Sequence, residues 1–238
     1  MNILKAIKNN IPNAITCCNL LSGVLASVAS FSTFDEVVCG LQGYQVAFAL
    51  IALGAVFDFF DGFVARLIGA SSQLGGELDS LSDSVTFGLA PALVLYNMMR
   101  LANPGSLLCF GVLIIPVFGA IRLAKFNVDT TQTTTFRGLP IPSNAIFWIG
   151  FAQWYATHHT CPEWVVLVFA VALSLLMVCN LRMFSLKLHS LGLKENYRQW
   201  LLLVVMVTPV CVFGLEGLAG GIVFYVLLSA VAGTGVKV

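Results

Sequence analysis

Charged residues are scarce in this sequence. The 12 lysines and arginines and the 11 aspartates and glutamates make up 10% of the chain, against about 25% in soluble domains. The net charge is only +1 and no basic stripe is present, which argues against a nucleic-acid partner. No internal repeat, low-complexity run or segment with the composition of a soluble domain is visible. The seven cysteines form no CxxC pair, so we expect them to be apolar helix residues rather than metal ligands.

Long hydrophobic runs are abundant instead. The chain is 58% hydrophobic, with a mean hydropathy of +0.92, and several runs approach the roughly 20 residues that a helix needs to cross a bilayer. The sequence therefore predicts an all-α, polytopic membrane protein with about eight transmembrane helices. We place them near residues 14–34, 44–68, 82–101, 107–126, 142–158, 163–182, 199–215 and 217–235. A helix lying on the membrane surface is expected at residues 183–198.

The basic residues predict how these spans are oriented. If the N-terminus is cytoplasmic, eleven of the twelve lysines and arginines fall in cytoplasmic loops and only Arg100 falls outside. Because such loops carry the excess of basic residues, we expect both termini in the cytoplasm. The alternative for the first span is a signal peptide, since residues 25–29 resemble a cleavage site. Polar residues at 16–19 make a poor apolar core for such a peptide.

Acidic residues are concentrated in one short stretch. Five of the eleven carboxylates lie within 26 residues: Asp58, Asp61, Glu77, Asp79 and Asp83. Asp58 and Asp61 are three residues apart and Asp79 and Asp83 four apart, so on helices each pair shares one face. The small, polar residues between the pairs predict a chain reversal; they are Gly69, Ser71, Ser72, Gly75 and Gly76. Two helix ends would then present four carboxylates to each other.

Four clustered anions at membrane depth need compensation, because each central Asp costs about 2.5–3.5 kcal/mol to insert. Protonation would relieve the repulsion, and so would divalent cations. Carboxylate oxygens suit Mg²⁺ or Mn²⁺, and pairs of such ions about 3.5–4 Å apart recur in phosphoryl chemistry. We favour two divalent cations, Mg²⁺ or Mn²⁺, held by Asp58, Asp61, Asp79 and Asp83.

The spacing of this stretch resembles the signature of the CDP-alcohol phosphatidyltransferase family. The matching pattern is Asp58-x2-Asp61-Gly62-x2-Ala65-Arg66-x8-Gly75-x3-Asp79-x3-Asp83. The resemblance implies transfer of a phosphatidyl group from a CDP-linked lipid to an alcohol, with release of CMP. It also implies that Asp58, Asp61 and Asp79 ligate metal. Asp83 would complete the site and accept the proton of the acceptor hydroxyl, a task that suits a positioned carboxylate.

Six further residues are predicted to bind the CDP-lipid: Gly62, Ala65, Arg66, Gly75, Thr16 and Asn19. Gly62, Ala65 and Gly75 are small where a flat nucleotide must approach the backbone, although small residues also serve helix packing in membranes. Arg66 can pair with diphosphate oxygens or anchor a helix end on the cytoplasmic side. Thr16 and Asn19 either close the pocket or form hydrogen bonds between helices.

Three more stretches resemble the phosphatidylserine synthase branch of this family. They are residues 15–20, residues 87–91, and residues 122–127 leading to 136–142. The resemblance assigns residues 1–145 to the catalytic region and 146–238 to additional transmembrane helices. The predicted serine-binding residues are Arg122, Lys125, Asn127 and Arg137, and anchoring of cytoplasmic loops is the alternative role for each. The branch usually carries arginine at Lys125, and lysine lacks the bidentate fork of arginine.

We therefore expect an enzyme that makes phosphatidylserine and CMP from CDP-diacylglycerol and L-serine in the cytoplasmic membrane. Its active site would face the cytoplasm, and the resemblance suggests a homodimer. One alternative is the same chemistry on another acceptor such as glycerol 3-phosphate, as in phosphatidylglycerophosphate synthases. An archaeal-type lipid backbone is also compatible with the sequence. From another class comes a cation transporter with intramembrane aspartates, which does not explain the spacing of Gly62, Ala65, Arg66 and Gly75. A structural scaffold offers nothing to offset the buried acids.

Overall fold

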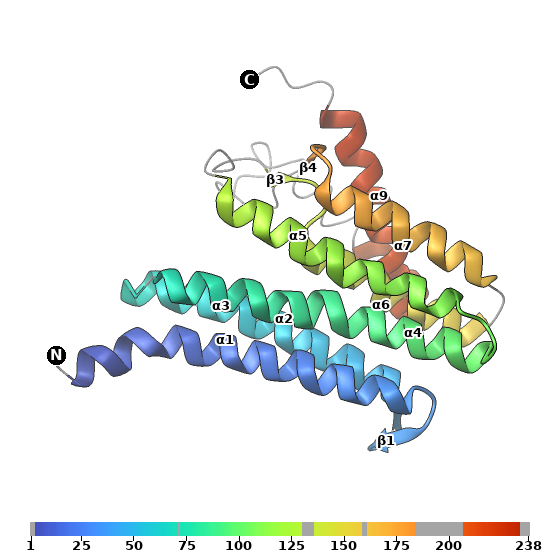
Figure 1. Cartoon of the computed structure of the whole chain (residues 1–238), viewed down its shortest axis with the longest axis horizontal. Helices are drawn as coiled ribbons and strands as arrows, with labels where there is room; N and C mark the ends of the chain where they lie inside the picture. Colours follow the sequence, from blue (N-terminus) through green and yellow to red (C-terminus); the bar gives the residue numbers. More distant parts are fainter. Residues whose placement is uncertain (1–2, 71, 130–135, 159–160, 184–206, 234–238) are drawn as a thin grey trace. The chain divides into compact units, whose positions relative to one another are not determined.

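The computed structural model describes residues 3–70, 72–129, 136–158, 161–183 and 207–233. These residues are mostly helical, which confirms the all-α class (Figure 1). Strand is limited to two short antiparallel ribbons in the described ranges. Contacts divide the chain into two compact units, Met1–Ala124 and Lys125–Val238, and each is described by itself.

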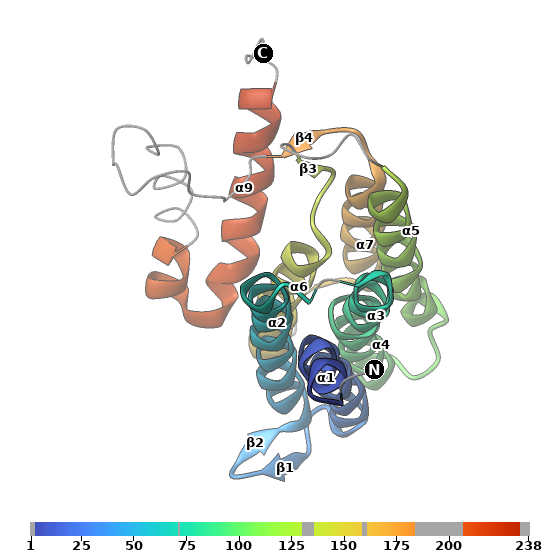
Figure 2. The same cartoon turned by 90° about the vertical axis from the view of Figure 1, so that its left-hand side faces the viewer.

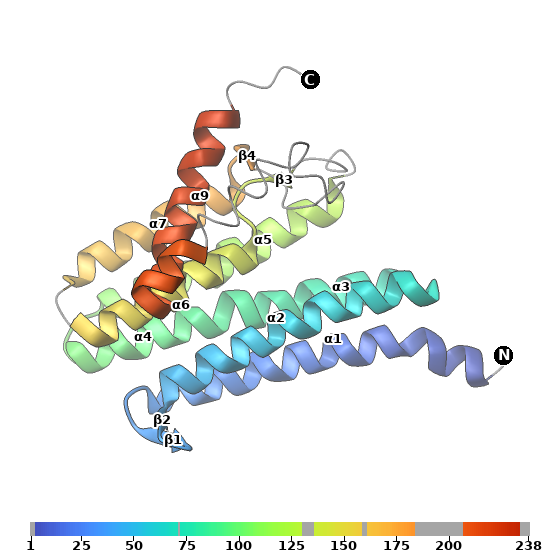
Figure 3. The same cartoon turned by 180° about the vertical axis from the view of Figure 1, so that it is seen from behind.

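The first unit is built on four long helical segments. Its elements are α1 (Ile3–Ala29), η1 (Ser30–Ser32), β1 (Glu36–Val38), β2 (Leu41–Gln42), α2 (Gly43–Ile68), α3 (Gln73–Asp83), η2 (Ser84–Leu89), α4 (Ala90–Ala102), η3 (Leu108–Leu113) and α5 (Ile114–Val128), which runs past the division at Ala124. β1 and β2 form a hairpin between α1 and α2 (Figure 2). α1 packs along α2 and also contacts α3 and η2 (Figure 3). The helices that carry the acid pairs therefore share α1 as a neighbour.

A tight corner joins α2 to α3. Gly69 ends α2 in the left-handed conformation (φ 63°), and its N–H faces the carbonyl groups of Ala65 and Arg66, as is usual for a glycine cap. Ser72 starts α3, because its side chain accepts a hydrogen bond from the N–H of Gly75 at 3.0 Å. The break is therefore shorter than the sequence predicts. Gly75 and Gly76 lie in the first turn of α3 and not in the loop.

α3 continues through η2 into α4 as one helical run. Residues Ser84–Leu89 form a π-helix that starts directly after Asp83. Such wide turns often occur at functional sites. Thr86, in this segment, is fully buried and lies against two glycines, Gly23 on α1 and Gly54 on α2. The absence of side chains at these two positions lets α1 and α2 approach η2 closely.

The second unit contains α6 (Ile141–His158), α7 (Glu163–Val178), helical residues 207–213, η4 (Gly214–Glu216) and α9 (Gly217–Gly233). β3 (Phe136–Arg137) pairs with β4 (Arg182–Met183). α6 packs against α7 and α9. Its core is aromatic: the ring of Phe147 lies 5.0 Å from that of Trp148 and 5.8 Å from that of Phe169, and Trp148 is fully buried.

Five helical segments of the described chain are long and apolar enough to cross a membrane: Asn10–Ser32, Gly43–Ile68, Gln73–Ala102, Leu108–Val128 and Val207–Ala230. The chain is thus a multi-pass membrane protein, but the expected count of eight spans is not confirmed. α6 and α7 occupy two further expected positions, and α7 is short, with 16 residues. Residues 184–206, which include most of the expected surface helix and part of the span at 199–215, lie outside the described residues.

The packing around Thr86 generates a stability prediction. A Cβ at Gly23 would lie 2.7 Å from Thr86 Cα, closer than real contacts allow, whereas a Cβ at Gly76 would meet nothing within 4 Å. We expect Gly23→Ala to destabilise the protein by about 1–3 kcal/mol through overpacking. Gly76→Ala should instead stabilise it by up to about 1 kcal/mol, because alanine favours helix.

Thermal unfolding of the two variants in one detergent measures this difference. A Gly23→Ala variant as stable as the Gly76→Ala variant would contradict the close approach of α1 and η2.

Candidate active site

The two acid pairs lie on opposite sides of the corner between α2 and α3. Asp58 and Asp61 belong to the C-terminal half of α2, and Asp79 and Asp83 belong to α3. Three of the four predicted carboxylates come together across this corner. One side-chain oxygen each from Asp58, Asp61 and Asp79 lies within 4.8 Å of the other two. We call these three residues the aspartate trio.

The aspartate trio has the properties of a cation site. Asp61 is buried and Asp58 and Asp79 are half-buried. Asp79 Oδ1 is buried and accepts no hydrogen bond from the residues that the structure describes. Over the same residues, no lysine or arginine forms a salt bridge with the trio. Converging carboxylate oxygens without a basic partner suit a hard divalent cation such as Mg²⁺ or Mn²⁺. The side chains present therefore fit the metal that the sequence predicts.

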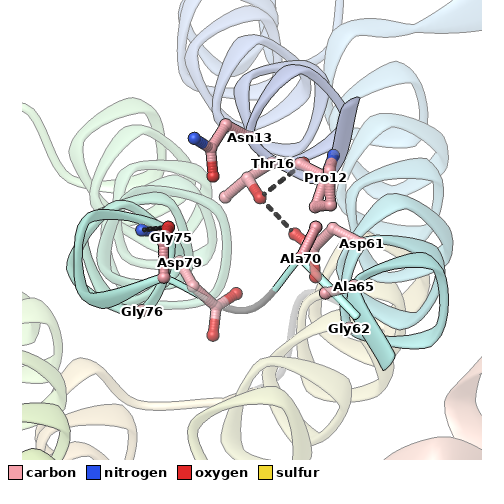
Figure 4. A pocket seen from close by; sticks show the side chains of 11 residues that line it. Pro12, Asn13, Thr16, Asp61, Gly62, Ala65, Ala70, Gly75, Gly76 and Asp79 are labelled. Atoms are coloured by element: carbon pink, nitrogen blue, oxygen red, sulfur yellow. Dashed lines mark hydrogen bonds between the residues drawn. The ribbon is translucent and has the colours of Figure 1, made fainter. Parts of the chain in front are cut away.

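A pocket of about 220 Å³ opens beside the trio. Asp61 and Asp79 lie on opposite sides of it, and Thr16 enters from α1 (Figure 4). The Thr16 hydroxyl lies 2.6 Å from Asp61 Oδ2 and donates to it; the Pro12 carbonyl oxygen, at 3.0 Å, competes for the same hydrogen. This hydrogen bond fixes one carboxylate of the trio at the wall of the pocket. The lining residues are Pro12, Asn13, Thr16, Asp61, Gly62, Ala65, Ala70, Ser72, Gly75, Gly76 and Asp79.

Small residues keep this pocket open. A Cβ at Gly62 would have one neighbour within 4 Å, the guanidinium Nη1 of Arg66 at 3.9 Å. Helix packing therefore does not account for Gly62. At Gly75 the surroundings are tighter, because a Cβ would lie 3.0 Å from Asn13 Oδ1 and 3.1 Å from the Ser72 hydroxyl. Arg66 is exposed at the end of α2 and is not among the lining residues.

Asp83 is not one of the three aspartates whose oxygens converge, but its charge interacts with those of Asp58 and Asp79. It is buried, 8% exposed, and lies one helical turn beyond Asp79 on α3. Asn19 Nδ2 donates a hydrogen bond to Asp83 Oδ1 at 3.3 Å. The charge of half-buried Arg122, on α5, interacts with the Asp83 carboxylate. Asp83 thus has two polar neighbours of its own, Asn19 and Arg122, in addition to the charges of Asp58 and Asp79. Asn19 contacts Asp83 and is not among the residues that line the pocket.

The division between the two units falls within the predicted serine-binding residues. Arg122 belongs to the first unit, near Asp83, whereas Lys125, Asn127 and Arg137 belong to the second. Lys125 donates a hydrogen bond to the carbonyl oxygen of Val178, at the end of α7, at 3.2 Å. This contact gives Lys125 a structural role within its unit. Asn127 and Arg137 are exposed.

Several lining residues were not predicted from the sequence. Asn13 and Pro12 line the pocket from α1. A signal for them was present, because positions three and four residues before Thr16 share its helix face. Ser72 and Gly76 were assigned to the turn, whereas they also line the pocket. Glu77 is exposed and does not join the trio.

Comparison with known proteins points the same way as this geometry. The family model for CDP-alcohol phosphatidyltransferases matches residues 9–179. A protein of Methanocaldococcus jannaschii named CDP-diacylglycerol–serine O-phosphatidyltransferase is 34% identical over 159 residues, covering 66% of this chain and 74% of that protein.

Two further relatives carry the same name. One, from Mycobacterium leprae, is 36% identical over 168 residues, covering 64% of this chain and 53% of the relative, so the match spans about half of that protein. Another, from Helicobacter pylori, is 32% identical over 218 residues, covering 87% of this chain and 84% of the relative. The family match includes α1 from residue 9 onward, both acid pairs and the pocket between them. The chain belongs to the CDP-alcohol phosphatidyltransferase family and is an enzyme of that class.

Proposed function

We propose that this protein transfers a phosphatidyl group from CDP-diacylglycerol to the hydroxyl of L-serine, giving phosphatidylserine and CMP, and that the reaction requires two divalent cations. The observation that carries the proposal is the aspartate trio beside a pocket kept open by small residues. A diphosphate needs charge compensation, and a nucleotide needs close access to the backbone. Cations held by the trio would supply the first, and the open pocket beside it would supply the second.

Asp58, Asp61 and Asp79 are the proposed ligands of the cations, and family membership supports this dependence. Bound Mg²⁺ or Mn²⁺ would neutralise the diphosphate oxygens and stabilise the charge on the departing CMP. Thr16 holds Asp61 in place through its hydrogen bond. Gly62, Ala65 and Gly75 give the nucleotide access, and Arg66 is proposed to pair with the diphosphate from the end of α2.

Asp83 is the proposed general base. The serine hydroxyl oxygen attacks the phosphorus that carries the diacylglycerol, and a new O–P bond forms. The bond from that phosphorus to the bridging oxygen breaks, and its electron pair leaves with CMP. The hydroxyl proton passes to the Asp83 carboxylate. Its place outside the three converging carboxylates and its hydrogen bond from Asn19 support this role, and the family resemblance adds a second role for it as a metal ligand.

Serine as the acceptor rests on the names of the relatives. Arg122 is the strongest candidate to bind the serine carboxylate, because it lies near Asp83. Lys125, Asn127 and Arg137 remain proposed contacts. Glycerol 3-phosphate is the alternative acceptor, since the acid motif does not distinguish between alcohols.

The membrane arrangement is also part of the proposal. The concentration of basic residues in predicted cytoplasmic loops supports cytoplasmic termini and an active site that faces the cytoplasm. We propose the cytoplasmic membrane as its location and a homodimer as its assembly, the latter from family resemblance alone. A cation transporter would also hold intramembrane aspartates, but it has no need for the open backbone at Gly62.

Metal removal tests the central part of this proposal. Treatment of the purified protein with EDTA should abolish serine-dependent CMP release, because the trio would then repel the substrate diphosphate. Added Mg²⁺ or Mn²⁺ should restore it. Full turnover in the presence of EDTA, with metal content verified by elemental analysis, would contradict the proposed cation dependence.

Two aspartate variants separate the proposed roles. Asp83→Asn should lower kcat by about 10²- to 10⁴-fold, the usual contribution of a general base, while CDP-diacylglycerol binding stays largely intact. Asp61→Asn should weaken the binding of both metal and nucleotide. Glu77→Gln, an exposed acid on the same helix as Asp83, is the matched control and should behave as wild type.

Steady-state kinetics and calorimetric CDP binding report these differences. Near-normal turnover of either aspartate variant would remove that residue from its assigned role.

The acceptor is tested by measuring CMP release with serine, glycerol 3-phosphate, inositol phosphate and choline in parallel. We expect serine alone to stimulate release. Release with glycerol 3-phosphate but not with serine would move the protein to the phosphatidylglycerophosphate synthase branch. Cation flux into liposomes without any nucleotide turnover would support a transporter.

A further inference from the structure

Asn19 is a fully buried amide whose polar contacts point at one carboxylate. Its exposed fraction is 0%, and Nδ2 donates to Asp83 Oδ1 at 3.3 Å. The other amide atom, Oδ1, accepts no hydrogen bond from the described residues. Buried polar atoms are normally paired, so packing alone does not explain an amide at position 19.

Two side chains that flank Asp83 in sequence, Ser82 and Thr86, form hydrogen bonds with the backbone of α1. Thr86 donates its hydroxyl hydrogen to the Asn19 carbonyl oxygen at 3.0 Å. The Ser82 hydroxyl lies 3.2 Å from the Thr16 carbonyl oxygen and 2.8 Å from that of Leu78, and shares its single hydrogen between them. These bonds fix the register of α1 against α3 and η2. Asn19 is thereby held level with Asp83.

The other side of the amide is closed by α2. A Cβ at Gly54 would lie 2.9 Å from Asn19 Oδ1 and 2.5 Å from Thr86 Cγ2. A glycine is therefore required for α2 to approach the amide this closely. The π-helix of η2, which begins directly after Asp83, places Thr86 between Gly23 and Gly54. Three helical segments thus enclose the Asn19 side chain and limit its movement.

Asn19 has no place in the nucleotide pocket. The described lining includes Thr16, one turn earlier on α1, but not Asn19. Thr16 contacts Asp61 of the trio, whereas Asn19 contacts Asp83. Two successive polar residues on one face of α1 therefore serve two different aspartates.

We propose that Asn19 is a positioning residue for Asp83, which holds the carboxylate that receives the acceptor proton, and that it does not bind the nucleotide. This inference rests on the proposed function, in which Asp83 is the base. The donor N–H₂ fixes the direction of the Asp83 carboxylate, and the rigid enclosure of the amide keeps that direction constant. Removal of the amide leaves the aspartate trio and the pocket intact and slows the chemical step.

Asn19→Leu and Asn19→Ala test this proposal. Leucine keeps the approximate shape of the side chain without polar atoms, and alanine removes it. We expect kcat to fall by about 10- to 100-fold, the usual effect of losing a residue that orients a ligand or catalytic group. KM for CDP-diacylglycerol and the affinity for CDP should change little.

Two comparison variants define the alternatives. Ser22→Ala, one turn further along α1, removes a buried hydroxyl whose hydrogen bond among the described residues stays within its own helix, to the Cys18 carbonyl oxygen at 2.9 Å, and should leave kcat unchanged. Thr16→Ala alters the pocket wall and should weaken CDP binding. The contrast between the Asn19 and Thr16 variants is the decisive readout. General destabilisation would not lower kcat in one variant and CDP affinity in the other.

The remaining outcomes overturn the proposal. Loss of CDP affinity in the Asn19 variants, parallel to that of Thr16→Ala, would assign Asn19 to the nucleotide. Unchanged kcat in an Asn19 variant that binds CDP, or failure of both variants to yield folded protein, would assign it to helix packing. The wild type provides the test of the proposed function itself. If it releases no CMP with any acceptor, that function fails first, whereas use of another acceptor leaves the Asn19 comparison valid with that acceptor.

Discussion

Repulsion between like charges in an apolar surrounding is the constraint on which this structure depends. Three carboxylates meet within 4.8 Å of one another in helices long and apolar enough to span a membrane. Each such group is costly at membrane depth, and the described residues give the trio no basic salt-bridge partner. A site of this kind is stable only if something positive or a proton enters it. Divalent cations would meet that need and would also compensate the charge of a nucleotide diphosphate, so in the proposed function one arrangement serves both stability and chemistry.

The surrounding fold brings these acids together and gives Asp61 and Asp83 different hydrogen-bond partners. The glycine cap at Gly69 and the serine cap at Ser72 turn the chain sharply between the two acid pairs. α1 packs against both helices. Its Thr16 side chain donates a hydrogen bond to Asp61, and its Asn19 side chain donates one to Asp83. The aspartate trio and Asp83, the proposed base, are consequently contacted by two adjacent turns of the same helix. Close approach of the three segments depends on Gly23 and Gly54, which leave room for Thr86.

Much of this arrangement was predictable from the sequence, because local rules govern it. The all-α class follows from the apolar runs, and α2 begins and ends within one residue of its predicted range. The meeting of Asp58, Asp61 and Asp79 follows from their helical spacing and the small residues between the pairs. The π-helix after Asp83 and the pairing of Asn19 with Asp83 did not follow, since both depend on how three helices pack. The eight-span count is not confirmed either, because hydropathy alone does not fix where apolar helices begin and end.

The central claim is that divalent cations lie among these aspartates. Anomalous scattering from crystals of the protein grown with Mn²⁺ and CDP measures this directly, because the scattering locates the metal independently of activity. The account predicts anomalous peaks within coordination distance of the carboxylates of Asp58, Asp61 and Asp79, and their absence in crystals of Asp61→Asn. A well-ordered nucleotide beside an aspartate trio without any anomalous peak would contradict it.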